Sequence, residues 1–281
     1  MPQFLLVTLR HWSVDNTYVM VNLIMKHKII YILISLMMFS CGYTKQKQNL
    51  LSQKISEIEK LQDYGYFVTL FPDSIQARFY NREEPKLIYH PYRYLRDTAT
   101  IMELLELTDA DNPFVKLYSF SALEKRNYHD LFSIVIKHIS DTTKFYVFSD
   151  DHGWNSTTID MMLHYSQDKF TNTQKDSLKH LILTKYNNIG TLDNILLFFK
   201  PDTLYYPEIK KIALQNQNVF SLIALSTYQN QDDVALIRQG FNHIQYYSGT
   251  YIYFKAIENF PNKEFLPQLL EYKKNIKENS S

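Results

Sequence analysis

The chain has 281 residues, of which 30 are basic and 29 acidic, so its formal net charge is +1. This near-neutral charge argues against a protein that binds nucleic acid on a broad basic surface. The hydrophobic fraction of 45% excludes general disorder. The single cysteine, Cys41, excludes a disulfide framework, a Cys-rich zinc site and an iron–sulfur cluster. No phosphate-binding or dinucleotide-binding loop occurs, so we expect no cofactor.

Residues 26–41 have the pattern of a targeting signal. They read KHKIIYILISLMMFSC, in which two lysines precede an uncharged apolar run of 11 residues, from Ile29 to Phe39. A helix that spans a bilayer needs about 20 apolar residues, whereas the apolar core of a secretory signal peptide has about 7–15. The run ends at Ser40, Cys41 and Gly42, and a polar stretch follows. The length of the run therefore favours a signal peptide.

This arrangement resembles the signal peptide of bacterial lipoproteins, which is cut just before a cysteine that then receives lipid. Ser40 and Gly42 match that pattern, whereas Met38 and Phe39 depart from it because a Leu and a small residue are commoner there. The resemblance implies lipidation of Cys41. It also implies attachment to the inner or outer membrane, on the periplasmic side of the bacterial envelope. The alternative is an ordinary buried thiol in an N-terminal membrane anchor.

The first 24 residues fit no signal, because Arg10 and Asp15 lie ahead of the positive region. Met25 directly precedes Lys26, and our hypothesis is that translation starts there. Residues 1–40 form the signal region, whose removal takes away three basic residues and one acidic residue. The mature chain, Cys41–Ser281, keeps 27 basic and 28 acidic residues. Its charge indicates neither a polycationic nor a polyanionic partner.

The first part of the mature chain is predicted to combine a tether, a helix and a small β element. Residues 41–49 are polar, and apolar residues then recur at helical spacing over 49–62. Ser74–Phe79 alternates polar and apolar residues, as a half-buried strand does. With Phe67–Phe71 before it and Lys86–His90 after it, this segment predicts a three-stranded meander near 66–90. Residues 50–97 would thus hold the N-terminal helix and the meander.

Three alanines mark an internal repeat in the region 98–281, where the pattern is helical. Ala224 and Ala256 are 32 residues apart, and Ala122 precedes Ala224 by 102. A small residue there allows a paired helix to approach closely. Around each alanine an aromatic or aliphatic residue lies four positions earlier, an acidic residue eight later and an aliphatic residue thirteen later: Tyr118, Asp130 and Val135; Phe220, Asp232 and Ile237; Ile252, Glu264 and Leu269.

The interval between Ala122 and Ala224 leaves room for two further units of about 34 residues. One pairs Thr158–Tyr165 with Gln174–Tyr186, and the other pairs Leu192–Phe199 with Pro207–Leu214. A single helix pair cannot bury its apolar face alone, so neighbouring pairs must stack.

Over roughly 110–272 the pattern resembles HEAT-like and armadillo-like α-solenoids, although the spacing of 32–34 residues is shorter than theirs. The resemblance implies a mainly α fold of stacked helical hairpins. An irregular helical bundle is the alternative.

Two clusters are candidates for function. Asp150, Asp151, His152 and Trp154 could bind a cation, but adjacent loop residues seldom converge on one ion, and a helix-start loop explains them equally well. We therefore expect no metal site. A cluster of tyrosines beside Gly249 could form a binding face, because tyrosine is enriched at interfaces; the alternative is packing in the last repeat. These are Tyr246, Tyr247, Tyr251 and Tyr253.

No catalytic residue is assigned, since no nucleophile elbow, HExxH motif or second cysteine occurs. The sequence favours a membrane-anchored lipoprotein that is a non-catalytic binding scaffold for an envelope protein or glycan, and not for nucleic acid. The alternative is an envelope enzyme, or an accessory subunit in glycan metabolism, with its site near Asp150–Trp154.

Overall fold

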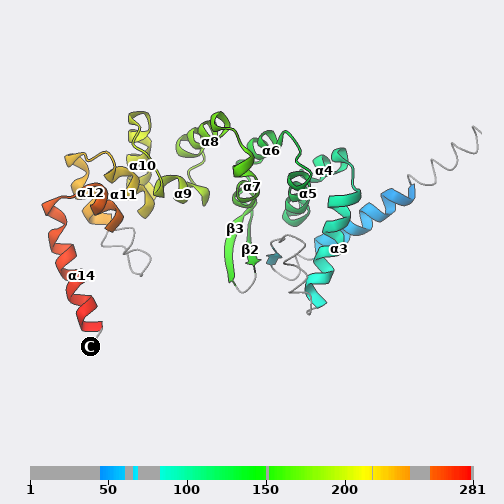
Figure 1. Ribbon diagram of the computed structural model, residues 1–281, viewed down its shortest axis with the longest axis horizontal. Helices are drawn as coiled ribbons and strands as arrows, with labels where there is room; N and C mark the ends of the chain where they lie inside the picture. Colours follow the sequence, from blue (N-terminus) through cyan, green and yellow to red (C-terminus); the bar gives the residue numbers. More distant parts are fainter. Residues whose placement is uncertain are drawn as a thin grey trace, which may run out of the picture. The chain divides into compact units, whose positions relative to one another are not determined.

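The computed structural model describes residues 45–60, 66–68, 83–149, 152–216, 218–240 and 254–279, which are mainly helical with one small sheet (Figure 1). The chain divides into two compact units, residues 1–57 and 58–281. In the first unit the described residues, 45–57, are helical. The helix predicted over 49–62 therefore begins four residues earlier, and residues 45–49 of the predicted tether belong to it.

The second unit begins with a correction to the predicted meander. Its third strand, Lys86–His90, lies within helix α3, Glu83–Thr98. Tyr92 and Leu95 lie three residues apart on this helix and are almost fully buried, as is Ala99 just after it, so helical spacing decides the structure here. Pro91 lies inside this helix, where loss of a backbone hydrogen bond costs about 3 kcal/mol. The buried face of α3 offsets that cost.

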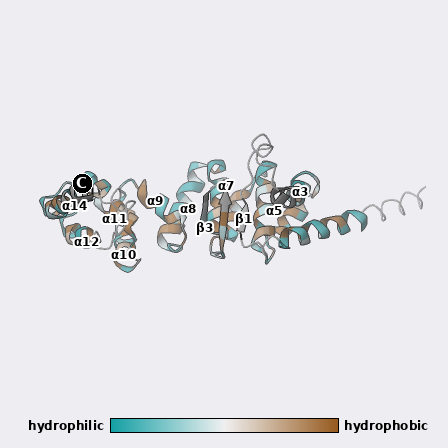
Figure 2. Ribbon diagram, turned by 90° about the horizontal axis from the view of Figure 1, so that it is seen from below, coloured by the Kyte–Doolittle hydropathy of each residue, from teal (hydrophilic) through white to brown (hydrophobic). Residues whose placement is uncertain are grey.

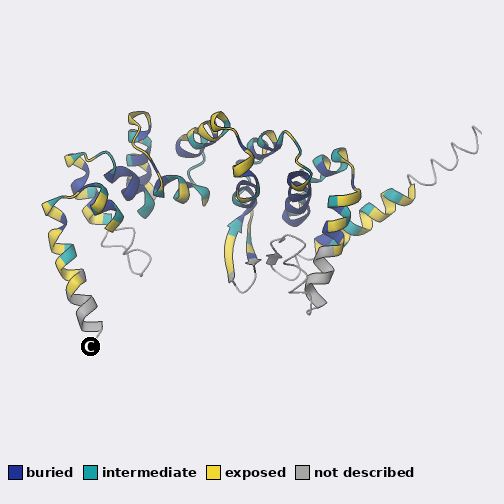
Figure 3. Cartoon of the chain, viewed as in Figure 1, coloured by how far each residue is buried: buried dark blue, intermediate teal, exposed yellow. Residues whose placement is uncertain are grey.

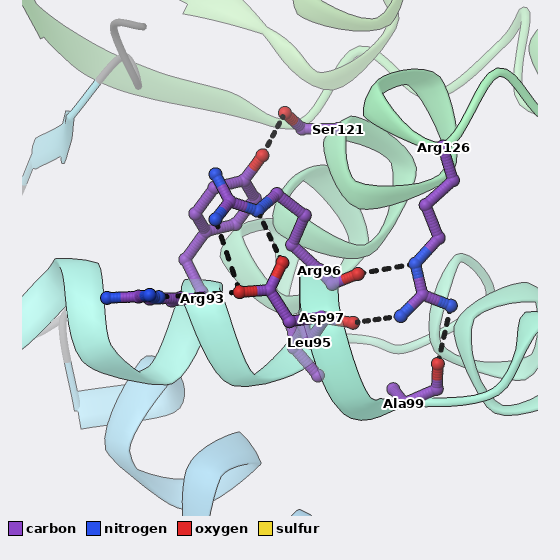
Figure 4. A network of polar contacts seen from close by, with 8 residues as sticks. Arg93, Leu95, Arg96, Asp97, Ala99, Ser121 and Arg126 are labelled. Atoms are coloured by element: carbon purple, nitrogen blue, oxygen red, sulfur yellow. Dashed lines mark hydrogen bonds and ion pairs between the residues drawn. The ribbon is translucent and has the colours of Figure 1, made fainter. Parts of the chain in front are cut away.

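A guanidinium group binds the carbonyl groups at the end of α3. It belongs to Arg126, the residue directly after the neighbouring helix α5, Pro113–Lys125. Arg126 donates hydrogen bonds to the carbonyl oxygens of Arg96, Ala99 (2.6 Å) and Leu95 (3.4 Å), as Figure 4 shows. Carbonyl groups in the last turn of a helix lack partners within the helix, and a cation there also favours the helix dipole. The hydroxyl groups of Tyr92 in α3 and Ser121 in α5 form a hydrogen bond of 3.3 Å.

A hairpin interrupts the helices between residues 144 and 157, where the sequence was predicted to be helical. Strand β2, Lys144–Ser149, pairs antiparallel with β3, His152–Thr157, and Val147 lies opposite Trp154. Strand β1, Tyr66–Val68, pairs parallel with β2, with Tyr66 opposite Tyr146. The described partner of β1 is thus a strand distant in sequence, whereas a meander would pair β1 with the next segment of the chain. Residues 69–82, where the second predicted strand lies, are outside the described chain.

The remaining helices are short, and we group them into pairs that are adjacent in sequence. The helices predicted for the two inserted units are present, within two residues of the predicted bounds. In Figure 2 the helices carry both apolar residues (brown) and polar residues (teal). After α4, Ile101–Leu107, the pairs are α5 with α6, Leu131–Lys137; α7, Thr158–Ser166, with α8, Asn172–Thr184; α9, Thr191–Leu197, with α10, Tyr206–Asn216; α11, Val219–Ser226, with α12, Val234–Gly240; and residues 254–259 with α14, Leu266–Asn279.

Polar side chains fix where these helices begin. Asn112 and Asn218 each accept two backbone N–H groups at the first turns of α5 and α11, and Asp130 accepts from Ser133 in α6. Asp130 was predicted to lie near the start of the second helix of its unit. It caps α6, which confirms this position. The corresponding Asp232 lies instead within a 3₁₀ turn, Gln231–Asp233, which Asn230 caps.

The three repeat alanines are fully buried, as their spacing predicts. Ala122, Ala224 and Ala256 expose no surface, and α5 is buried along most of its length (Figure 3). Contacts join successive first helices, α5 with α7 and α9 with α11, and also α10 with α11. The core of the second unit therefore continues from one pair to the next.

Ala224→Leu should lower the free energy of unfolding by about 1–3 kcal/mol, because added methyl groups overpack a filled helix contact. Ala235→Leu is the matched control: Ala235 lies exposed in α12, so its change should stay within about 0.5 kcal/mol. Denaturant unfolding of the full-length protein, followed by far-UV circular dichroism, measures both. Equal effects at the two alanines would contradict the assigned packing.

Candidate functional site

The structure describes few of the residues that the sequence singled out for function. Cys41, Asp150, Asp151 and the tyrosines at 246, 247, 251 and 253 lie outside the described parts of the chain. His152 begins β3, and Gly153 and Trp154 follow it as exposed strand residues, not as the predicted helix-start loop. The side chain of Tyr146 lies against Gly153, where an added Cβ would clash with the tyrosine ring and hydroxyl.

Two classes of feature are missing from the described parts of the chain. No group of three or more His, Cys, Asp or Glu side chains there could hold a metal ion. In the same residues no helix has both the length and the apolar character needed to cross a bilayer.

A groove of about 460 Å³ lies between consecutive helix pairs, where α8 and α9 are neighbours in both ribbon views. We call it the α8–α9 groove. Three segments form it: the 3₁₀ turn Gln167–Lys169 that leads from α7 to α8, one face of α8, and α9 with the residues just after it. The lining residues are Gln167, Asp168, Phe170, Lys175, Leu178, Lys179, Thr191, Asn194, Ile195, Phe198, Phe199 and Lys200.

The floor of the α8–α9 groove is apolar and well packed. Phe170 and Leu178 are almost fully buried, and the ring of Phe170 meets that of Phe132 edge to face at 5.3 Å. Phe199 packs edge to face against Tyr205, with ring centroids 6.2 Å apart. These ring contacts hold the side chains of the floor in place without a ligand.

Lysines come from two of the three segments that form the groove, and we call these two segments its borders. Lys175 and Lys179 lie four residues apart on α8 and hence on one helix face, and Lys200 follows α9. Lys179 pairs with Asp176 at 3.3 Å, and its ammonium lies 5.5 Å from the centroid of the Tyr205 ring. Within the described residues, Lys175 and Lys200 form no ion pair and no side-chain hydrogen bond.

Phe198 projects from the same groove into solvent. It is 77% exposed, the largest value among the exposed large apolar side chains of the described chain. A ring of this size normally gains free energy from burial, about 25 cal/mol per Å² of apolar surface removed from water. Asn194 and Lys200 line the same groove.

Asp160 of α7 sets the position of α9, which forms one wall of the groove. Its Oδ1 accepts hydrogen bonds from the backbone N–H of Thr191 (2.7 Å) and the Thr191 hydroxyl (2.8 Å). Its Oδ2 accepts from the N–H of Gly190 (3.0 Å). Gly190 precedes α9 and has no side chain to cap it, so the preceding helix pair supplies the cap. An added Cβ at Gly190 would meet the Asp160 carboxylate at 3.1 Å.

The next junction repeats this arrangement. Asp193 of α9 accepts a hydrogen bond at 2.7 Å from the Nδ2 of Asn218, the residue that caps α11. Burial raises the pKa of the Asp193 carboxyl, and the bond from Asn218 counteracts part of that rise. Asp160 and Asp193 thus hold corresponding positions in successive pairs.

A smaller hollow of about 200 Å³ lies at the preceding junction, between the α5–α6 turn and the start of α8. The buried Glu124 forms its polar wall, with Lys169 at 3.4 Å and Lys125 at 3.1 Å. The ion pair to Lys169 connects α5 to the turn after α7. Because the charges in this hollow balance, it differs from the basic α8–α9 groove.

One titratable cluster lies beside α6. His138 faces Asp109, with Nε2 at 3.1 Å from Oδ1, and Lys116 pairs with Asp141. Burial lowers the pKa of His138, and the ammonium group of Lys116 lowers it further, whereas Asp109 raises it. The pKa of Asp109 lies below its usual value mainly because Lys137 donates to it.

Comparison of the chain with models of known protein families found no match, and neither did searches of curated proteins and of solved structures. The assignment of the α8–α9 groove as the candidate site is therefore based on its geometry alone. Sequence reasoning did not find the α8–α9 groove. The one local signal for it was the pair Phe198 and Phe199 followed by Lys200 at the end of a predicted helix.

The lowered pKa of His138 predicts a pH dependence. Its unfolded form takes up a proton near pH 6.5, and the folded form does so only at lower pH, so the free energy of unfolding falls as pH drops through this range. Unfolding measured at pH 7.5 and 5.5 should show this loss. His138→Gln should reduce it, and the exposed His164→Gln should not. The carboxyls of Asp109 and Asp141, whose pKa values are lowered, lose their contributions only below about pH 4.

An equal pH effect in His138→Gln and the wild type would refute this assignment.

Proposed function

We propose that this chain is a membrane-anchored lipoprotein of the bacterial envelope, attached through lipid on Cys41 and facing the periplasm. Its helix pairs stack as a HEAT-like α-solenoid that binds an envelope protein or glycan without catalysis. The anchoring part rests on the signal pattern around Cys41, and the binding part rests on the geometry of the helix pairs.

Hydrogen bonds between consecutive pairs support the stacked arrangement. Beyond those made by Asp160 and Asp193, the Tyr206 hydroxyl donates to the buried Asp233 at 2.8 Å, and Gln229 donates to the carbonyl of Asn259 at 2.9 Å. The partners lie 25–31 residues apart in sequence, close to one repeat. A bond that recurs at the repeat interval is what stacking of similar units produces.

The α8–α9 groove is the observation that carries the binding proposal. Exposed apolar surface next to unpaired cations is stabilised when a complementary partner covers it. The exposed Phe198 and the lysines Lys175 and Lys200 supply both features at one place. A solenoid offers such grooves at each junction between repeats.

The alternative, an enzyme with its site near Asp150–Trp154, has less support. Catalysis by acid and base groups requires several titratable side chains that converge in a pocket. Trp154 is an exposed residue of β3, and the linings of both described hollows lie on other segments.

Cross-linking in intact cells, followed by membrane fractionation, tests this proposal. The full-length wild type should fractionate with membranes, incorporate labelled palmitate and cross-link to one recurrent envelope partner. Cys41→Ser should abolish palmitate incorporation, because lipidation requires the thiol. Alanine substitution of Asp150, Asp151 and His152 together should leave the cross-link intact.

A second variant, with Tyr246, Tyr247 and Tyr251 replaced by Ser, tests the tyrosine face independently. Loss of the cross-link in this variant alone places the partner on the C-terminal repeats. Loss in the Asp150–His152 variant, with an unchanged circular dichroism spectrum, would favour the enzyme alternative. Wild-type protein that takes up no palmitate would refute the lipoprotein proposal.

A further inference from the structure

We propose that the α8–α9 groove binds an acidic segment of a partner protein, in which at least two carboxylates flank an apolar side chain. This inference rests on the proposed function as a binding scaffold and names the chemistry of its partner. It depends on three features of the groove: its charge, its apolar floor and the exposed Phe198.

The charge of the lining determines the sign of the partner. Three lysines and one acidic residue, Asp168, line the groove, and no arginine does. Lys175 and Lys200 form no ion pair in the described part of the chain, so both ammonium groups are available to an external anion. Such complementarity favours an acidic partner and steers its approach.

The position of the lysines determines how many anionic groups the partner carries. Lys175 and Lys179 lie on α8, and Lys200 follows α9. The cations of the groove thus come from two separate helices. A segment with acidic side chains on either side of an apolar one can pair with lysines of both borders at once.

The apolar surface determines what lies between the carboxylates. Phe170, Leu178 and Phe199 form a packed floor, and Phe198 stands exposed beside it. A Phe or Leu side chain of the partner would bury itself against the floor and also cover Phe198. Aromatic anchors of this kind commonly supply much of the binding energy at interfaces.

Other anions fit this arrangement less well. A fatty acid has an apolar chain but only one carboxylate, which leaves the lysines of one border unpaired. Single-stranded nucleic acid also combines negative charge with rings that stack, but its binding proteins stack successive bases on several aromatic side chains. In this groove Phe198 is the one exposed ring among the lining residues, because Phe170 and Phe199 are buried.

Binding of a fluorescent peptide to the purified full-length protein in detergent tests the inference. The probe GDEFLDEG carries the proposed pattern. One control, GNQFLNQG, removes its charge, and another, GDESSDEG, removes its apolar side chains. The first peptide should bind measurably, and each control should bind at least about tenfold more weakly. Its affinity should fall as salt rises from 50 to 300 mM, because exposed ion pairs are screened (on the order of an 8 Å Debye length at physiological ionic strength).

Matched variants place the binding site. Lys175→Glu with Lys200→Glu should weaken binding of GDEFLDEG roughly tenfold or more, because two attractions become repulsions. Lys211→Glu with Lys273→Glu changes the net charge equally at exposed positions outside the groove and should leave binding unchanged within about twofold. Phe198→Ser should weaken binding, whereas Leu214→Ser, at a 60% exposed residue of α10, should not.

Three results would overturn the inference: no binding of GDEFLDEG, equal binding of GNQFLNQG, or equal losses in the two double variants. Stronger competition by oleate or by a single-stranded oligonucleotide than by unlabelled GDEFLDEG would also overturn it. Failure of these assays, with the cellular cross-link to an envelope partner still present, would refute the acidic segment and leave the scaffold proposal intact. Loss of that cross-link as well would refute both.

Discussion

The fold depends on one physical constraint: a pair of short amphipathic helices cannot bury its apolar face by itself, so each pair needs its neighbours. Asp160 shows how one junction is made. Its carboxylate, on α7, accepts both backbone N–H groups at the start of α9 and the Thr191 hydroxyl. An anion at a helix N-terminus is stabilised by the helix dipole. Because Gly190 provides no cap of its own, the start of α9 depends on the preceding helix pair.

The same constraint explains where the candidate binding site arises. Helix pairs meet along their apolar faces, and the turns that join their helices leave hollows at the junctions. At the α5–α7 junction the hollow is smaller, and the ion pair of Glu124 and Lys169 balances its charge. At the next junction the corresponding region is lined by three lysines and an apolar floor, and it remains open. A chain of nearly neutral net charge can therefore carry a locally basic groove.

The sequence predicted the helices well and the small sheet poorly. The buried alanines at 122, 224 and 256 recur with helical neighbours, so the pattern contains the packing directly. The hairpin at 144–157 was overlooked although Phe145–Phe148 is a run of aromatic and β-branched residues, which favour strands. The pairing of β1 with β2 joins residues 80 positions apart, which no local pattern encodes. The α8–α9 groove was missed for the same reason, since Lys175 and Lys200 come together only when two helix pairs pack.

Amide hydrogen exchange of the full-length protein, read by mass spectrometry, tests most directly whether one helix pair supports the next. Asp160→Ala removes the three bonds to the start of α9, and Asp176→Ala removes an exposed carboxylate of α8 as the matched control. The account predicts faster exchange in α9 and α10 for Asp160→Ala, with α5 and α6 unchanged and the control like the wild type. Unchanged protection of α9, or a uniform loss along the whole chain, would contradict it.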